Sequence, residues 1–197
     1  RGILAQGGSG VAKLTVDTCE FAGLKRSGRQ PGSGCGTAVN VALHERFTCD
    51  DSLFCSNGVP ILNGSTNSGT ADNRGVKGSV MLIQSTPVTM RNTRIAANGG
   101  SCRVSGGDGG IVYISGYADG SAYTNCAFVG NYANYFRDNS SVNNTCGAFV
   151  YSQCAASHRL DFESCTFAYN LSQGNYSPGG LNVLNGTVKV HNSIFWH

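Results

Sequence analysis

The chain has 197 residues, of which 28 are glycine and only 13% are charged, and its formal net charge at pH 7 is +3. The hydrophobic fraction of 40% is too high for a disordered tail. The scattered charge contains no lysine or arginine block of the kind that binds nucleic acid or a membrane surface. The longest apolar runs, such as Val80–Ile83, are far shorter than the roughly 18 residues of a membrane-spanning helix. We therefore expect a folded segment that neither binds nucleic acid nor crosses a membrane.

A glycine followed by a short apolar segment recurs along the whole chain. These glycines are Gly2, Gly36, Gly78, Gly110, Gly147 and Gly180. Their positions differ by 32 (78 to 110) to 42 (36 to 78) residues. Such a period indicates a repeat architecture, in which each unit buries its apolar side against the next one. We expect a single β-helical domain or segment over residues 1–197, with coils that start near 2, 36, 78, 110, 147 and 180.

A second pattern lies between these glycines, and the segments Leu160–Phe167 and Val188–Phe195 are its clearest copies. Two apolar residues alternate with polar ones and are followed by a Cys, Ser or Thr, with a Phe or Ile two positions later. Period-two alternation predicts strands with one buried face. The segment 36–55 is expected to lack this pattern. Aligning the copies predicts an interior stack of Phe21, Ile95, Phe128, Phe167 and Phe195. It also predicts a left-handed corner at Asn92, Asn125 and Asn192, with Thr18 and Ser164 as variants.

The fold that these patterns predict is all-β. It is a right-handed parallel β-helix, a solenoid of about six coils, with long loops on one side. A β-sandwich also has short strands and many turn residues. A sandwich, however, does not explain why one motif returns in the same phase along the chain.

Two short motifs resemble those of a known repeat family. Phe128–Asn131 and Phe167–Asn170 read FxxN, and Gly109–Ile111 and Gly179–Leu181 read GG followed by an aliphatic residue. This pairing resembles the polymorphic outer-membrane-protein repeat of chlamydial and other large β-helical surface proteins. The resemblance implies an extracellular or cell-surface protein with a structural or adhesive role, such as an adhesin, a stalk or a fibre. It implies display and binding rather than catalysis.

The nine cysteines suit an oxidising compartment. Cys49 and Cys55 bracket a five-residue loop and are the best candidates for a local disulfide, and Cys102 and Cys146 are expected to bridge neighbouring loops. The sequence also predicts buried thiols at one shared repeat position, which is occupied by Cys19, Cys126 and Cys165.

Six Asn-x-Ser/Thr sequons are present, whereas chance predicts about three, so they favour a secreted glycoprotein. The candidate glycosylation sites are Asn63, Asn139, Asn143, Asn170, Asn175 and Asn185.

The main alternative is a polysaccharide lyase or glycoside hydrolase of the pectin-lyase-like β-helix type. Its candidates are two pairs of acids. Asp50 and Asp51 lie inside the loop between Cys49 and Cys55, and Asp161 and Glu163 share an outward strand face. We expect Asp161 to lie beside Lys189 and Glu163 beside His191, as solvated surface neighbours. No catalytic, cofactor-binding or metal-binding residue is therefore assigned, and no cofactor is expected.

The expected partners are other coils, either flanking ones or those of identical units stacked head to tail, because the first and last coils carry no polar cap. Tyrosines in or beside the long loops, such as Tyr132 and Tyr169, either form a surface that binds carbohydrate or a neighbouring protein or shield the edges of the coils.

Overall fold

The structure is a computed structural model that describes residues 2–6, 12–25, 37–42, 45–58, 79–103, 110–136, 149–152, 155–172 and 179–197. The regular structure in these ranges is all β-strand, arranged in three six-stranded sheets and one three-stranded sheet. Neighbouring strands are parallel in each sheet. The described residues contain no helix that is long and apolar enough to cross a membrane.

The strands of each sheet follow one another in chain order. Sheet A consists of β1 (Ile3–Gln6), β4 (Val39–Ala42), β7 (Met81–Gln84), β11 (Val112–Ser115), β15 (Phe149–Ser152) and β19 (Leu181–Val183). Sheet B consists of β2 (Lys13–Asp17), β5 (Arg46–Asp50), β8 (Val88–Arg91), β12 (Ser121–Thr124), β16 (Arg159–Glu163) and β20 (Thr187–His191). Sheet C consists of β3 (Glu20–Ala22), β6 (Leu53–Cys55), β9 (Arg94–Ala96), β13 (Ala127–Val129), β17 (Thr166–Ala168) and β21 (Ile194–Trp196). The short sheet D consists of β10 (Gly99–Arg103), β14 (Tyr132–Phe136) and β18 (Leu171–Ser172).

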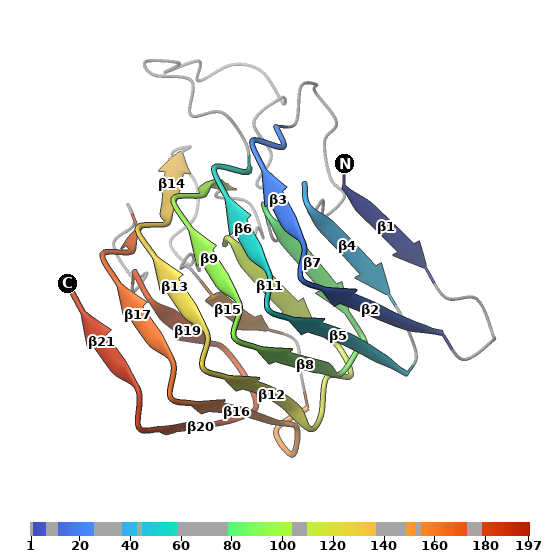
Figure 1. Ribbon diagram of the computed structural model, residues 1–197. Helices are drawn as coiled ribbons and strands as arrows, with labels where there is room; N and C mark the ends of the chain where they lie inside the picture. Colours follow the sequence, from blue (N-terminus) through green and yellow to red (C-terminus); the bar gives the residue numbers. More distant parts are fainter. Residues whose placement is uncertain are drawn as a thin grey trace.

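The chain passes through sheets A, B and C in turn and then returns to sheet A. We call each set of three consecutive strands from these sheets a repeat, from the first (β1, β2, β3) to the sixth (β19, β20, β21). Figure 1 shows the repeats side by side from blue to red, with the two ends of the chain at opposite ends of the stack. This arrangement confirms the all-β, stacked parallel part of the predicted fold and is compatible with a solenoid.

The interior contains a column of side chains along sheet C, which are Phe rings at every position except Ile95. Phe21, Phe54, Ile95, Phe128, Phe167 and Phe195 are successive partners in the strand register. The rings of Phe128 and Phe167 are stacked with centroids 4.7 Å apart, and so are those of Phe167 and Phe195. Offset or parallel stacking at this spacing adds to the free energy gained from burial alone.

Phe54 in this column corrects an expectation from the sequence. The segment 36–55 was expected to lack the strand pattern, but it forms β4, β5 and β6 in register with its neighbours. Phe47, Cys49 and Phe54 point inward and are fully buried. The pattern is present there with Phe47 and Cys49 at the two inward positions of β5, which Val88 and Met90 occupy in the next repeat.

A left-handed corner joins sheet B to sheet C in every repeat. The residues with positive φ at this corner are Thr18 (50°), Asp51 (47°), Asn92 (47°), Asn125 (52°), Ser164 (55°) and Asn192 (47°). Asn125 Nδ2 donates a hydrogen bond of 2.8 Å to Asn92 Oδ1, one repeat earlier. Asn and Asp tolerate this backbone conformation better than most residues, so the predicted corner is confirmed, with Asp51 as an additional member.

A buried asparagine ladder lies three residues after the ring column. Its members are Asn57, Asn98, Asn131 and Asn170, each at most 4% exposed. Each Oδ1 accepts a hydrogen bond from the backbone N–H of the equivalent residue one repeat earlier, at 2.9–3.1 Å. Each Nδ2 donates to a backbone carbonyl of that earlier repeat, at 2.7–2.9 Å. The FxxN motif therefore joins successive repeats: the Phe packs in the interior, and the Asn satisfies buried backbone groups.

Candidate functional surfaces

The outward faces of sheets B and C carry most of the accessible strand residues. In sheet B the outward positions hold Thr15, Thr48 and Thr89 in successive repeats, with charged columns on both sides. In sheet A the outward residues Asn40 and Leu82 are at most 6% exposed, whereas Leu4 on β1 and Gln84 at the end of β7 are exposed. A partner that binds the described strands from the side would therefore contact mainly sheet B or sheet C.

The paired acids on sheet B are spread over the face rather than gathered in a site. Asp161 lies beside Lys189, and Glu163 beside His191, in the strand register. The closest ionic partner of Asp161 is on its own strand, however, where Arg159 Nε donates to Asp161 Oδ1 at 2.7 Å. The two side chains are 45% and 35% exposed, and ion pairs with this exposure contribute about 1 kcal/mol or less.

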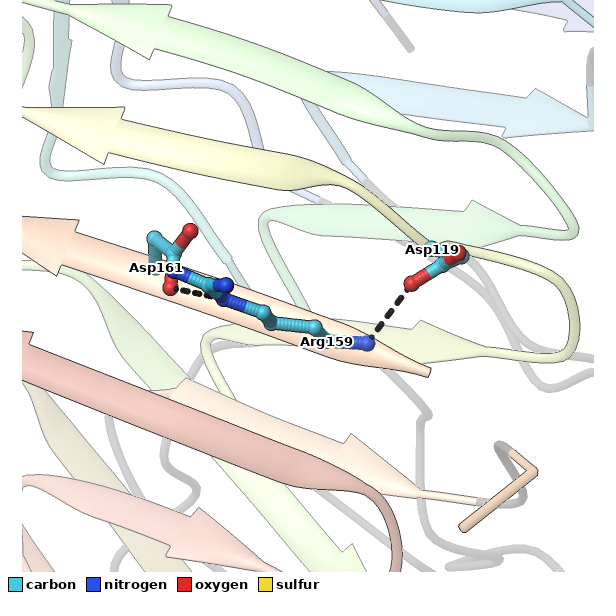
Figure 2. Close-up of polar contacts among 3 residues, drawn as sticks. All are labelled: Asp119, Arg159 and Asp161. Carbon is cyan, nitrogen blue, oxygen red and sulfur yellow. Dashed lines mark hydrogen bonds and ion pairs between the residues drawn. The ribbon is translucent and has the colours of Figure 1, made fainter. Parts of the chain in front are cut away.

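Arg159 also connects two repeats, as Figure 2 shows. Its backbone N–H donates 2.9 Å to Oδ1 of Asp119, which lies in the turn before β12. The carbonyl of Arg159 in turn accepts a hydrogen bond from Gly120 N–H at 3.2 Å. Asp119 thus holds the turn of one repeat against the strand of the next, whereas Asp161 pairs with Arg159 within that strand. Both roles are structural.

The second acid pair, Asp50 and Asp51, belongs to a strand end and a corner rather than to a loop. Asp50 ends β5 and lies between Asp17 and Arg91 in the register. Asp51 occupies the left-handed corner that Asn92, Asn125 and Asn192 fill in three other repeats. Within the described part of the chain, no group of three or more His, Cys, Asp or Glu side chains is arranged to hold a metal ion.

The disulfide expected between Cys49 and Cys55 is not formed, since both thiols are free. Cys49 lies on β5 with its side chain buried in the interior, whereas Cys55 lies on β6, where the neighbouring Phe54 takes the inward position. The corner between the two strands places them in different sheets. Cys146 and the side chain of Cys102 lie outside the described residues.

Cys19, Cys126 and Cys165 share a column with hydroxyl side chains at the corner. The full column is Cys19, Ser52, Thr93, Cys126, Cys165 and Ser193. Each side chain donates a hydrogen bond to the carbonyl two residues earlier, at 2.7–3.4 Å. A thiol and a hydroxyl are therefore interchangeable here as donors to the strand end.

The burial expected for these three cysteines holds at two of them. Cys126 and Cys165 are 2% and 1% exposed, and both thiols are free. Cys19, in the first repeat, is exposed. Burial matters to the chemistry of such thiols, because the thiolate is the reactive form.

The pKa values of the interior thiols are shifted in different directions. Burial raises the pKa of Cys49 from 9.0 to about 11, although hydrogen bonds with Thr93 and Ser52 act in the opposite direction. The hydrogen bond with Cys165, together with burial, raises the pKa of Cys126 far above its usual value. The same hydrogen bond lowers the pKa of Cys165, so Cys165 is the member of the pair that ionises first.

Two of the six sequons lie in described parts of the chain, and their asparagines differ in exposure. Asn185 is exposed, and its Oδ1 accepts a hydrogen bond from the next backbone N–H. Asn170 is 4% exposed, and its Nδ2 donates to Phe128 O at 2.7 Å as part of the asparagine ladder. A glycan on that nitrogen does not fit the folded chain, which corrects the expectation for Asn170. The sites at Asn63, Asn139, Asn143 and Asn175 lie outside the described residues.

The two tyrosines named as possible partner contacts also differ. Tyr169 is 63% exposed at a corner next to the ladder, whereas Tyr132 is half-buried on β14. Comparison with protein-family models, curated proteins and solved structures finds no match to this chain.

Proposed function

We propose that the chain is a right-handed parallel β-helix of six coils that acts as a structural or adhesive module of an extracellular surface protein. In this proposal each repeat is one coil, and the chain is similar in kind to the polymorphic outer-membrane-protein repeat. Right-handedness follows the strong preference of crossover connections between parallel strands.

The asparagine ladder is the observation that carries this proposal. The FxxN motif of the sequence recurs in four repeats and ends at Asn57, Asn98, Asn131 and Asn170. In the repeat that contains Asn98, Ile95 occupies the Phe position. Their side chains are buried and are used for stacking one repeat on the next. Because the residues that recur most regularly join one repeat to the next, we infer that the role of the chain is to form a stack of repeats.

The outward strand faces support an adhesive role alongside the structural one. Sheets B and C present flat rows of small, polar and mixed-charge side chains at the regular spacing of parallel strands. Flat faces of this kind suit broad, shallow contact with carbohydrate or a neighbouring surface.

The enzyme alternative makes a different prediction, which an assay tests directly. We expect the chain to show no lyase or hydrolase activity above buffer on acidic or neutral polysaccharides. Turnover that is lost in Asp161→Ala or Glu163→Ala, and retained in Glu20→Ala on the face of sheet C, would overturn the structural proposal. Glu20 is a matched control because it is an exposed acid on a strand.

Surface display is tested on the cells that produce the protein. Antibodies against the folded chain should label intact cells as strongly as permeabilised ones. Labelling that appears only after permeabilisation would contradict an extracellular location.

A further inference from the structure

The register of the strands brings two of the five described cysteine side chains together. Cys126 follows β12 and Cys165 follows β16, and these two strands are parallel neighbours in sheet B. The strands that come next, β13 and β17, are also neighbours, with Ala127 beside Thr166. Cys126 and Cys165 therefore lie side by side at the same corner of the fourth and fifth repeats, inside the stack.

The side chains of the two cysteines point in the same direction. Each thiol donates to the carbonyl two residues earlier at 3.4 Å, and both residues are at most 2% exposed. Cys165 Sγ also lies 3.4 Å from Tyr123 O, which belongs to the repeat of Cys126, so this sulfur leans toward its neighbour. A hydrogen bond between the two thiols places them in direct contact.

The spacing of the two cysteines suits a disulfide. Parallel neighbours lie about 4.7–4.9 Å apart, and the Cα atoms of a disulfide lie about 4.4–6.8 Å apart. Among the other described cysteines, Cys19 has Ser52 as its neighbour, Cys49 has Val16 and Met90, and Cys55 has Ala22 and Ala96. In the described part of the chain, therefore, only Cys126 and Cys165 are neighbours in register.

We propose that Cys126 and Cys165 form a disulfide in an oxidising environment, and that this bond joins the fourth repeat covalently to the fifth. The bond would close a loop from 126 to 165, which is one full repeat. A cross-link of this length restricts the unfolded chain and so favours the folded one. The cost of the lost thiol hydrogens is small, because an S–H group is a weak donor.

The oxidant in this proposal is a small-molecule disulfide such as oxidised glutathione. The thiolate of Cys165 attacks one of its sulfurs, a mixed disulfide forms, and a glutathione thiolate leaves. The thiolate of Cys126 then attacks Cys165 Sγ, and the second glutathione thiolate leaves. Two electrons pass from the pair to glutathione, and the two leaving thiolates take up the two protons. Cys165 reacts first because its hydrogen bond with Cys126 lowers its pKa.

Burial determines when the bond can form. Both side chains are at most 2% exposed, so oxidised glutathione does not reach them in the closed stack. The bond is therefore expected to form while the chain folds, and its test starts from unfolded, reduced chain. The inference does not depend on the proposed surface role, although an extracellular chain would meet the oxidising conditions that the bond requires.

Peptide mapping after refolding tests the inference. The reduced chain is refolded from urea in a mixture of reduced and oxidised glutathione, its remaining thiols are alkylated, and it is digested with trypsin without reduction. Cleavage after Arg103, Arg137, Arg159 and Lys189 gives the peptides 104–137 and 160–189, each of which contains one cysteine. We expect these peptides to be joined, with a mass two hydrogen atoms below their sum, and to separate in dithiothreitol. Folded chain in which both cysteines are alkylated, or in which either peptide is joined to a different one, would overturn the proposal.

Thermal unfolding of oxidised and reduced chain tests the stabilising effect. Oxidation should raise the midpoint of wild type by several degrees. Cys126→Ser and Cys165→Ser should lose most of this rise, and both should fold, because Ser52 and Ser193 already occupy the same column. Cys55→Ser is the matched control, since its thiol is also free but lies on β6 away from the pair, and it should keep the full rise. A rise that is as large in Cys126→Ser as in wild type would overturn the stabilising role.

Export to the bacterial periplasm keeps the inference testable if the reduced chain does not refold. The periplasm is an oxidising compartment, and the chain folds there without prior denaturation. The same digestion of folded, exported chain should give peptides 104–137 and 160–189 joined to each other. Separate peptides from folded, exported chain would show that the pair remains reduced, and the inference would be wrong.

Discussion

Asn131 Oδ1 accepts two hydrogen bonds from Asn98 in the preceding repeat, one from the backbone N–H at 3.1 Å and one from Nδ2 at 2.9 Å. The Nδ2 of Asn131 donates to Ile95 O at 2.8 Å and to Asn170 Oδ1 at 3.0 Å. Both Asn131 and Asn98 are 1% exposed. One buried amide thus satisfies polar groups of the repeats on both sides.

Asn131→Ala is expected to destabilise the fold by about 3 kcal/mol or more. The substitution leaves several buried groups without partners, and each such group costs about 1–3 kcal/mol. Asn185→Ala, at an exposed asparagine, should change the free energy of unfolding by less than about 0.5 kcal/mol. Urea unfolding of the two variants measures the difference. Similar values for both would mean that the ladder contributes nothing to stability.

Phe167→Ala is expected to cost roughly 3–5 kcal/mol, because the rings on either side cannot close the cavity it leaves. Phe195→Ala should cost clearly less, since Phe195 is half exposed and has a ring neighbour on one side. Glu163→Ala, on the outward face, should stay within about 0.5 kcal/mol. Chemical denaturation of the three variants measures the order of these losses in the free energy of unfolding. Equal losses at positions 163 and 167 would show that the inward and outward faces are assigned wrongly.

Cys165→Ser is expected to be tolerated, with a loss of no more than about 1 kcal/mol. Ser193 and Ser52 already occupy this column and donate to the carbonyl two residues earlier at 2.7 Å. Cys165→Val should cost more, about 1–3 kcal/mol, because valine is larger and cannot donate a hydrogen bond. Thermal unfolding under reducing conditions compares them. A serine variant that is less stable than the valine variant would contradict a hydrogen-bonding role for the column.

The stability of the chain is expected to fall as the pH rises from 9 to 11, in part because of Cys49. Burial raises the pKa of Cys49 to about 11 in the folded chain, so the unfolded chain loses this proton first and is favoured as the pH rises. The shift of about two pH units corresponds to about 2–3 kcal/mol. Wild type and Cys49→Ala should therefore differ less in stability at pH 11 than at pH 8. Parallel pH dependence of the two in urea unfolding would contradict this assignment.

Glycosylation is expected at Asn185 and not at Asn170 in folded chain secreted from a eukaryotic host. Asn185 is exposed, whereas the amide nitrogen of Asn170 is buried and hydrogen-bonded to Phe128 O. Mass spectrometry of peptides after enzymatic deglycosylation in ¹⁸O-labelled water identifies the modified residues. Modification of Asn170 in soluble, folded chain would contradict its place in the ladder.

Most of the interior was predictable, because the residues that specify it recur at the same point of each repeat. The stack from Phe21 to Phe195 and the corner at Asn92 and Asn125 follow from aligning short segments of the sequence. Phe54 was missed because its repeat has Phe and Cys at inward positions. The signal that identifies it is the spacing from Phe47 to Ser52 and Phe54, which matches that from Leu160 to Cys165 and Phe167.

The role of the FxxN asparagine was not predictable from spacing alone. The sequence does not distinguish a glycosylation site from a ladder position at Asn170, because the Asn-x-Ser/Thr tripeptide carries no information about burial. The partners of its side chain, Phe128 and Asn131, are about 40 residues earlier in the chain. Likewise, Cys49 and Cys55 are close in sequence, but the corner between them directs their side chains to different surroundings.

The sequence by itself determined which residues face inward, because alternation along a strand is a local property of the backbone. It also determined where the left-handed corners lie, since few residues adopt that conformation without strain. Only the tertiary structure decided which inward residues are covered. Burial of Phe167 and exposure of Phe195 differ because one has a repeat on each side and the other has a repeat on one side only. That difference depends on contacts between residues 28 to 44 positions apart, and the pattern within a single repeat does not contain them.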